Sequence, residues 1–170
     1  VIPTVQAAAI TSAKDTLTRV KASTAANHVI VFTSPTGVAA GQTITLTFGS
    51  GFTMNTLDFA DVDVLDDGAE LTLAATPSGA TWGVALSGQV ITITSGTGTI
   101  AAASVITVEI GTNATNQTTG DTQITNPTAG GNTVAVAGTF GDTGTIALSI
   151  IADDQVVVTA TVDPSITFTV

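Results

Sequence analysis

Five aspartates lie close together in the sequence, directly before Gly68: Asp58, Asp61, Asp63, Asp66 and Asp67. Carboxylates and backbone carbonyls are the ligands of Ca²⁺, which takes about six to eight oxygens in a flexible geometry. The last four aspartates therefore form a candidate calcium site, and calcium is the one cofactor for which the sequence offers ligands. Their spacing is not that of an EF-hand, because no Glu closes the loop. A solvated acidic strand face is the alternative interpretation.

Few residues of the chain could act as a catalytic acid, base or nucleophile, since it has one His and no Cys. His28 lies among Val and Ile, and no Gly-x-Ser-x-Gly motif accompanies it, so a structural histidine is the better interpretation. Glu70 and Glu109 are of the type that glycosidases use, but each lies inside a segment typical of a solvent-facing strand. We therefore expect that the protein is not an enzyme.

Two acceptor patterns for N-linked glycans begin at Asn113 and Asn116. Both lie in residues 111–132, a stretch rich in Thr, Asn and Gly that predicts a long surface loop. In a chain rich in Thr such patterns also arise by chance. Glycosylation and coincidence are both open interpretations.

All three basic residues, Lys14, Arg19 and Lys21, lie near the start of the chain, whereas its formal net charge is −10. Binding to nucleic acid is not expected, because Lys and Arg are needed to neutralise phosphates. A basic segment ahead of an acidic body predicts that the segment docks on the body of another copy, since opposite potentials steer association. A general bias in residue usage would produce the same asymmetry.

Alternation of apolar and polar residues recurs along most of the chain and predicts strands. We expect about eight to ten antiparallel strands packed as an Ig-like β-sandwich, an all-β fold. Asp67-Gly68 is typical of a tight hairpin turn. The only candidate helix covers residues 5–14, and no apolar run is long enough to predict a membrane-spanning helix. The expected strands are residues 28–33, 43–48, 59–65, 70–73, 80–86, 89–94, 104–110, 133–139, 145–151, 156–162 and 166–170.

The chain is expected to divide into an N-terminal arm, residues 1–24, and a sandwich domain, residues 25–170. The arm begins with ten uncharged residues, extended by Pro3. This segment either pairs as an edge strand in its own sheet or adds as a donor strand to a neighbouring subunit. Residues 165–170 are the second candidate donor. The candidate donor residues in the arm are Val1, Ile2, Val5, Ala7, Ala9 and Ile10.

Residues 26–33 and 35–48 read ANHVIVFT and PTGVAAGQTITLTF without a charged residue, and the tail runs from Asp153-Asp154-Gln155 to residues 162–168. These segments resemble a secreted Ig-like surface-protein module of uncultured small-genome bacteria. The resemblance covers about a third of the chain and implies an exported, Ig-like surface domain with no catalytic assignment. By analogy, donor-strand exchange is the way in which pilus subunits of this general architecture polymerise.

Together these observations predict a structural subunit of an extracellular, pilus-like filament at the cell surface. Its partner would be a second copy, joined head to tail by donor-strand complementation, which leaves an open and therefore growing chain. The alternative is a monomeric secreted adhesin or carbohydrate-binding surface module with an unknown surface or glycan target. The single Trp82 and the absence of Tyr disfavour sugar stacking.

Overall fold

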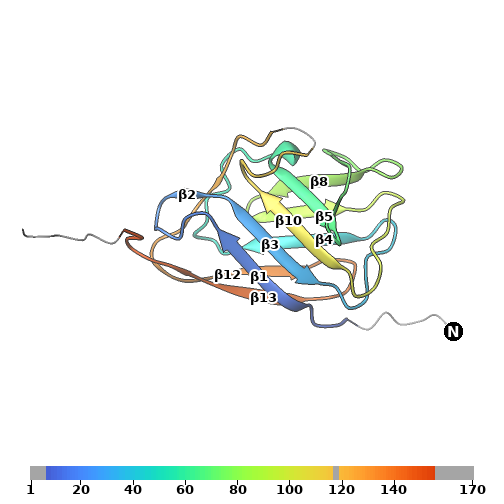
Figure 1. Cartoon of the computed structure of the whole chain (residues 1–170), viewed down its shortest axis with the longest axis horizontal. Helices are drawn as coiled ribbons and strands as arrows, with labels where there is room; N and C mark the ends of the chain where they lie inside the picture. The colour runs from blue at the N-terminus through green and yellow to red at the C-terminus, as the bar shows by residue number, and fades with distance from the viewer. Residues whose placement is uncertain (1–6, 117–118, 156–170) are drawn as a thin grey trace, which may run out of the picture.

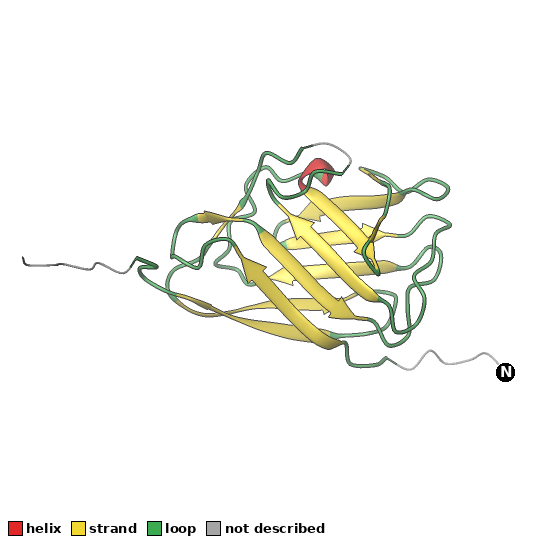
Figure 2. Cartoon of the chain, in the orientation of Figure 1, coloured by secondary structure: helices red, strands yellow, loops and turns green. Residues whose placement is uncertain are grey.

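The computed structural model describes residues 7–116 and 119–155. Strands dominate these residues and pack as two facing sheets (Figures 1 and 2), which confirms the predicted all-β sandwich. Of the thirteen strands in the described part, four are only two residues long. No helix in this part of the chain is long and apolar enough to cross a membrane.

The two main sheets have five and six strands. The order in the first sheet is β1 (Thr11–Leu17), β3 (His28–Thr33), β10 (Val105–Ile110), β5 (Val62–Asp66) and β6 (Ala69–Glu70). The order in the second is β13 (Gly144–Ile150), β12 (Gly130–Ala137), β4 (Thr43–Phe48), β9 (Val90–Thr94), β8 (Trp82–Ser87) and β7 (Leu73–Ala74). A separate pair joins β11 (Ile124–Thr125) to β2 (Ala25–Ala26).

Side-chain alternation explains why these segments form a sandwich. In β3 and β4, every second side chain is buried, because successive side chains of a strand point to opposite faces of the sheet. The inward-facing residues of both sheets meet in one apolar core, which includes Ile30, Phe32, Ile44, Leu46 and Ile106. The hydrophobic effect of burying these side chains is what holds the two sheets together.

The predicted hairpin turn at Asp67-Gly68 is present between β5 and β6. Asp67 has φ 49° and Gly68 has φ 83°, the pair of positive values that a two-residue turn requires to match the twist of its strands. Asp67 also fastens the turn to β10, since Oδ1 accepts a hydrogen bond from the Val105 N–H at 2.8 Å. The turn therefore fixes the register at one end of the first sheet.

The helix expected over residues 5–14 does not form in the part that is described. Residues from Thr11 onward belong to β1, which pairs antiparallel with β3 and has a β-bulge between Thr11 and Lys14. Thr and Ser disfavour helix, and pairing with a buried strand decides the conformation. β1 lies inside the predicted arm of residues 1–24 and is an edge strand of the first sheet. The division into an arm, residues 1–24, and a sandwich domain, residues 25–170, stays a prediction.

The two ends of the described chain leave the sandwich at opposite ends of its longest axis. Figure 1 shows the blue segment that precedes β1 at the right and the red segment that follows β13 at the left. Two isolated bridges join the residues that flank β1 and β13: Ala9 pairs with Thr143 before these strands, and Lys21 pairs with Ile151 after them. Each chain end is thus attached to the edge where the two sheets approach one another.

Candidate functional site at the chain ends

The N-terminal end is held by a short parallel pairing with the turn before β13. The Ile10 N–H donates to the Thr143 carbonyl at 3.0 Å, and the Thr143 N–H donates to the Ala8 carbonyl at 2.9 Å. The Ile10 side chain lies where a side chain on Gly144 would be, so any Cβ at Gly144 would clash with it. Residues 8–10 are therefore seated on their own chain.

A buried carboxylate, Asp142, fastens this end further. Its oxygens accept hydrogen bonds from the Ser34 hydroxyl at 2.7 Å, the Thr36 N–H at 3.0 Å, the Thr36 hydroxyl at 2.8 Å and the Ala8 N–H at 3.3 Å. Burial alone would raise the pKa of Asp142, but the hydrogen bonds from Thr36, Ser34 and Ala8 outweigh it and hold the pKa below its usual value. Asp142 thus joins the N-terminal segment to the turn after β3.

Sequence reasoning missed Asp142. It lies in the segment Gly141-Asp142-Thr143-Gly144, which looks like any polar turn. Its main partners, Ser34 and Thr36, are more than 100 positions away, so no local pattern signals the contact. The one available sign is an acid between two glycines at a strand start.

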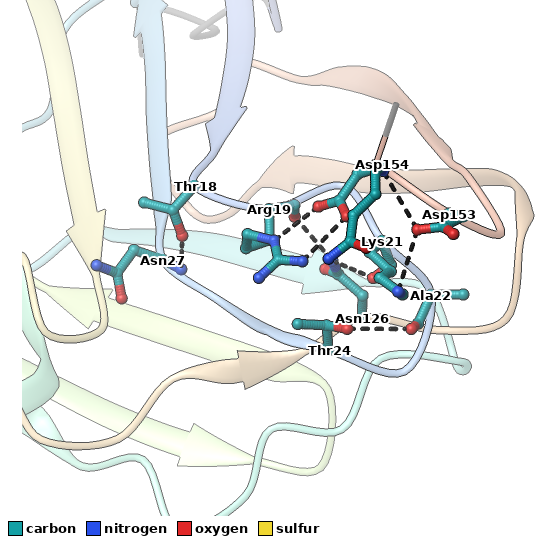
Figure 3. A network of polar contacts seen from close by, with 10 residues as sticks. Thr18, Arg19, Lys21, Ala22, Thr24, Asn27, Asn126, Asp153 and Asp154 are labelled. Carbon is teal, nitrogen blue, oxygen red and sulfur yellow. Dashed lines mark hydrogen bonds and ion pairs between the residues drawn. The ribbon is translucent and has the colours of Figure 1, made fainter. Parts of the chain in front are cut away.

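The C-terminal end of the described chain is held by two ion pairs (Figure 3). The Arg19 guanidinium binds both oxygens of Asp154, at 2.6 and 3.0 Å, and Lys21 Nζ lies 3.1 Å from Asp153 Oδ1. These contacts lower the pKa values of Asp153 and Asp154, mainly through the hydrogen bonds from Lys21 and Arg19, and raise the pKa of Arg19. The four side chains are between 16% and 59% exposed, so each ion pair adds little to the free energy of unfolding. The pairs chiefly set the position of the chain after β13.

Backbone contacts complete this end. The Ala22 N–H donates to the Ile151 carbonyl at 2.8 Å, and the Ile151 N–H donates to the Val20 carbonyl at 2.9 Å. The Asn126 side-chain amide donates to the carbonyls of Arg19 and Lys21 (Figure 3). The path of the chain after β13 is therefore fixed as far as Asp154.

The predicted docking and donor residues divide into described and undescribed groups. Arg19 and Lys21 form ion pairs with their own chain, whereas Lys14 is exposed on β1 and forms no ion pair with any described residue. Ala9 and Ile10 take part in the contacts with the Thr143 turn, and Ala7 is exposed just before them. Val1, Ile2, Val5 and residues 165–170 lie outside the described residues. Docking and strand donation stay predictions.

The four candidate calcium ligands do not converge on one point. Asp61 accepts the N–H groups of Asp58, Asp121 and Thr122, and Asp63 accepts those of Thr115 and Asn116. Asp67 is bound to β10 as described above. Over residues 7–116 and 119–155, no three His, Cys, Asp or Glu side chains are grouped so that they could hold a metal ion. The aspartates instead attach loops to the first sheet, and calcium binding stays a prediction.

The outer face of the first sheet does gather three carboxylates. Glu109 on β10 is opposite Asp63 on β5, and Glu70 follows on β6. Burial, and then the charge of Asp63, raises the pKa of Glu109, and the same two causes followed by Glu109 raise the pKa of Glu70. Because ionisation is opposed in the folded state, these carboxylates reduce stability at neutral pH.

We therefore expect Glu109→Gln to raise the free energy of unfolding at pH 7 by ~0.5 kcal/mol, a small effect because the Glu109 side chain is itself only partly buried. The folded-state pKa of Glu109 is raised, so the gain should fade as the pH falls below the usual range of a glutamate, where both states are protonated. Urea unfolding at pH 7 and pH 3.5 measures it. Asp121→Asn, which removes an exposed loop charge, is the control, and an equal gain there would contradict a role for Asp63.

The two glycosylation candidates differ in accessibility. Asn113 is half-buried, and its amide nitrogen lies 3.4 Å from the His28 carbonyl, to which it donates. A glycan attached to that nitrogen would have to displace this contact. Asn116 is exposed. Asn116 is therefore the better candidate, and glycosylation of either residue stays a prediction.

His28 has a structural environment, not that of an accessible base. Its Nδ1 lies 2.7 Å from Asp15 Oδ2, and neither side chain is exposed. The ring packs edge-on against Phe48 and Phe52, with centroid distances of 5.3 and 5.8 Å. The pair joins β1 to β3 from inside the sandwich.

Comparison with known proteins gives few matches. No protein-family model and no curated protein matches the chain. Among solved structures, BcpA, the major pilin subunit of Bacillus cereus, is similar at 12% identity with a TM-score of 0.40, over 80% of this chain and 37% of that one. A variant of BcpA is similar at 13% identity with a TM-score of 0.41, over 80% of this chain and 38% of that one. This chain thus spans little more than a third of the BcpA chain, and likeness of this degree carries no functional argument.

Proposed function

We propose that the protein is a structural subunit of an extracellular, cell-surface filament in which copies join head to tail. The observation that carries the proposal is the exit of the two chain ends at opposite ends of the sandwich, each attached by its own contacts (Figure 1). A contact between unlike ends is heterologous and need not close, so copies add without limit. The proposal involves no catalytic step and no cofactor.

The joining element in this proposal is residues 1–6 of one copy, which precede the seated residues 8–10. In this proposal the donor strand adds to a sheet edge, where main-chain hydrogen bonds can hold an extended segment. β7 pairs with β8 only as far as Gly83, and the edge of β8 beyond it has no neighbouring strand among the described residues. Six extended residues span about 20 Å, enough to cover residues 84–87.

Two truncations test the joining element. We expect the chain without residues 1–6 to form no fibres in negative-stain microscopy, whereas the chain without residues 156–170 still forms them. Neither deletion removes a described residue, and we expect circular dichroism to show an unchanged β-type spectrum. Fibres that survive the first deletion but not the second would make the C-terminal segment the donor. Fibres that survive both would contradict assembly by strand addition.

The alternative, a monomeric adhesin or carbohydrate-binding module, makes a different prediction. A monomeric module requires the full chain and both truncated forms to remain single particles at every concentration. Size-exclusion chromatography of the full chain and of the two truncated forms therefore separates the two functions.

A further inference from the structure

β1 is attached to the interior of the sandwich by polar groups more than by apolar ones. None of its seven residues belongs to the apolar core, and five of them are exposed. On its inward side Leu17 is half-buried, whereas the Asp15 side chain is fully enclosed, with Oδ2 2.7 Å from His28 Nδ1 on β3. A carboxylate and an imidazole therefore form the main side-chain attachment of this edge strand to the interior.

The Asp15 carboxylate has few hydrogen-bond donors for a buried acid. Among the described residues it contacts His28 alone, and Asp15 Oδ1 and His28 Nε2 are buried without a partner there. Asp142, by comparison, accepts four hydrogen bonds. An ionised carboxylate inside a protein is costly unless donors or an opposite charge compensate it. For Asp15, the imidazole has to supply that compensation.

Among the described residues, no other charged side chain of the elements packed around the pair faces it. Lys14 on β1 and Glu109 on β10 are opposite outward positions of β3, so both lie on the outer face of the sheet. β4, β13 and residues 49–57 contain no charged residue. The charge of the pair is therefore set by Asp15 and His28 themselves.

We propose that the Asp15–His28 pair keeps one proton in the folded chain that an ionised aspartate beside a neutral imidazole would lack, so that the pair has no net charge. A lone negative charge enclosed with a single donor is far more costly than a neutral pair. The proton gives either an imidazolium beside a carboxylate or an imidazole beside a carboxylic acid, and the count is the same. Phe48 and Phe52, with ring centroids 5.3 and 5.8 Å from that of the imidazole, lie in the range at which aromatic rings attract a cation.

This proton makes the attachment of β1 sensitive to alkaline pH. In an unfolded chain, aspartate ionises near about pH 3.9 and histidine loses its proton near about pH 6.5, so above about pH 7 neither residue holds the proton. The folded pair holds it, and unfolding must release it. The equilibrium constant for unfolding therefore rises about tenfold for each pH unit above about 7, whereas the pair has little effect on it between about pH 5 and 6.

Urea unfolding of the native chain and of Asp15→Asn, from pH 5 to pH 9, tests the proposal. The amide carries no charge, so His28 in this variant needs no extra proton and unfolding releases none above pH 7. We expect the alkaline rise in the native chain and its loss in Asp15→Asn. Equal slopes in the two proteins would overturn the proposal. So would a native unfolding constant that falls up to about pH 6.5 and then levels, because an ionised aspartate beside a neutral imidazole gives that curve.

A direct proton count on the native chain needs no variant. Unfolding in weakly buffered urea at pH 8 should release about one proton per chain, which a pH indicator detects. Release of no proton would overturn the proposal.

Trypsin reports on β1 itself, because all three basic residues of the chain lie between positions 14 and 21. Cleavage after Lys14 requires β1 to leave the sheet, and its rate follows the population of the open form. We expect this rate, relative to an unstructured peptide of the same sequence, to rise about tenfold from pH 7.5 to pH 8.5 in the native chain and to stay constant in Asp15→Asn. The same pH dependence in both would overturn the role of the pair in holding β1. Each of these measurements uses single chains, so the outcome is independent of the proposed filament.

Discussion

Replacing Asp142 with alanine is expected to lower the free energy of unfolding by about 3 kcal/mol. The substitution removes the acceptor of hydrogen bonds from Ser34, Thr36 and Ala8, and Asp142 is fully buried. Donors left without a partner inside a protein cost far more than a typical hydrogen bond contributes. Urea unfolding of the two proteins at pH 7 measures the difference.

The pH dependence of this difference identifies its cause. The pKa of Asp142 is lowered in the folded state, so its contribution is fully present above the unfolded value of about 3.9 and is lost as the pH falls through the lower folded value. Asp153→Ala is the control, because it removes an exposed carboxylate and should change stability little. An Asp142→Ala difference that stays constant down to pH 2 would show that lost packing, not the carboxylate, is responsible.

His28→Phe is expected to lower the free energy of unfolding by about 3 kcal/mol, the usual cost of breaking a buried pair by removing one partner. The change leaves Asp15 inside the sandwich without its hydrogen-bond partner. Phenylalanine keeps the edge-on ring contacts with Phe48 and Phe52, so the loss of aromatic packing is small.

The double variant Asp15→Leu/His28→Phe is the internal control for this prediction. Asp15 Oδ1 and His28 Nε2 are buried without partners among the described residues, so the polar pair is only partly satisfied. An apolar pair of similar volume should therefore recover most of the loss. A double variant that unfolds as easily as His28→Phe alone would show that the unpaired Asp15 carboxylate is not the cause of the loss.

The strands inside the sheets were predictable because their sequences alternate. β3 and β4 have the expected bounds, since each alternates buried with less buried positions along its length. The turn at Asp67-Gly68 was equally clear, because few residue pairs accept two positive φ values. At these positions the local sequence and the burial in the sandwich favour the same backbone conformation.

β1 was not predictable in the same way. Its seven residues, TSAKDTL, are mostly exposed and lack alternation, so the segment resembles a weak helix as much as a strand. Its conformation depends on β3, with which it pairs across ten intervening residues or more. Edge strands of this kind are specified by their neighbour, not by their own pattern.

The contacts at the chain ends could not be predicted from the sequence for another reason: the residues that form them are far apart in the chain. Arg19 and Asp154 are 135 positions apart, and Asp142 and Ser34 are 108 apart. The asymmetry of charge indicated that the basic segment would find an acidic partner, but not that the partner lies on the same chain. Only the topology, which places β13 beside β1, brings these residues together.

Negative-stain microscopy of the purified full chain is the most direct test of head-to-tail assembly. Head-to-tail assembly predicts unbranched fibres whose repeating unit is one sandwich, with the longest axis of each sandwich along the fibre. Monodisperse single particles at every concentration, or fibres in which the long axis of each sandwich lies across the fibre, would contradict it.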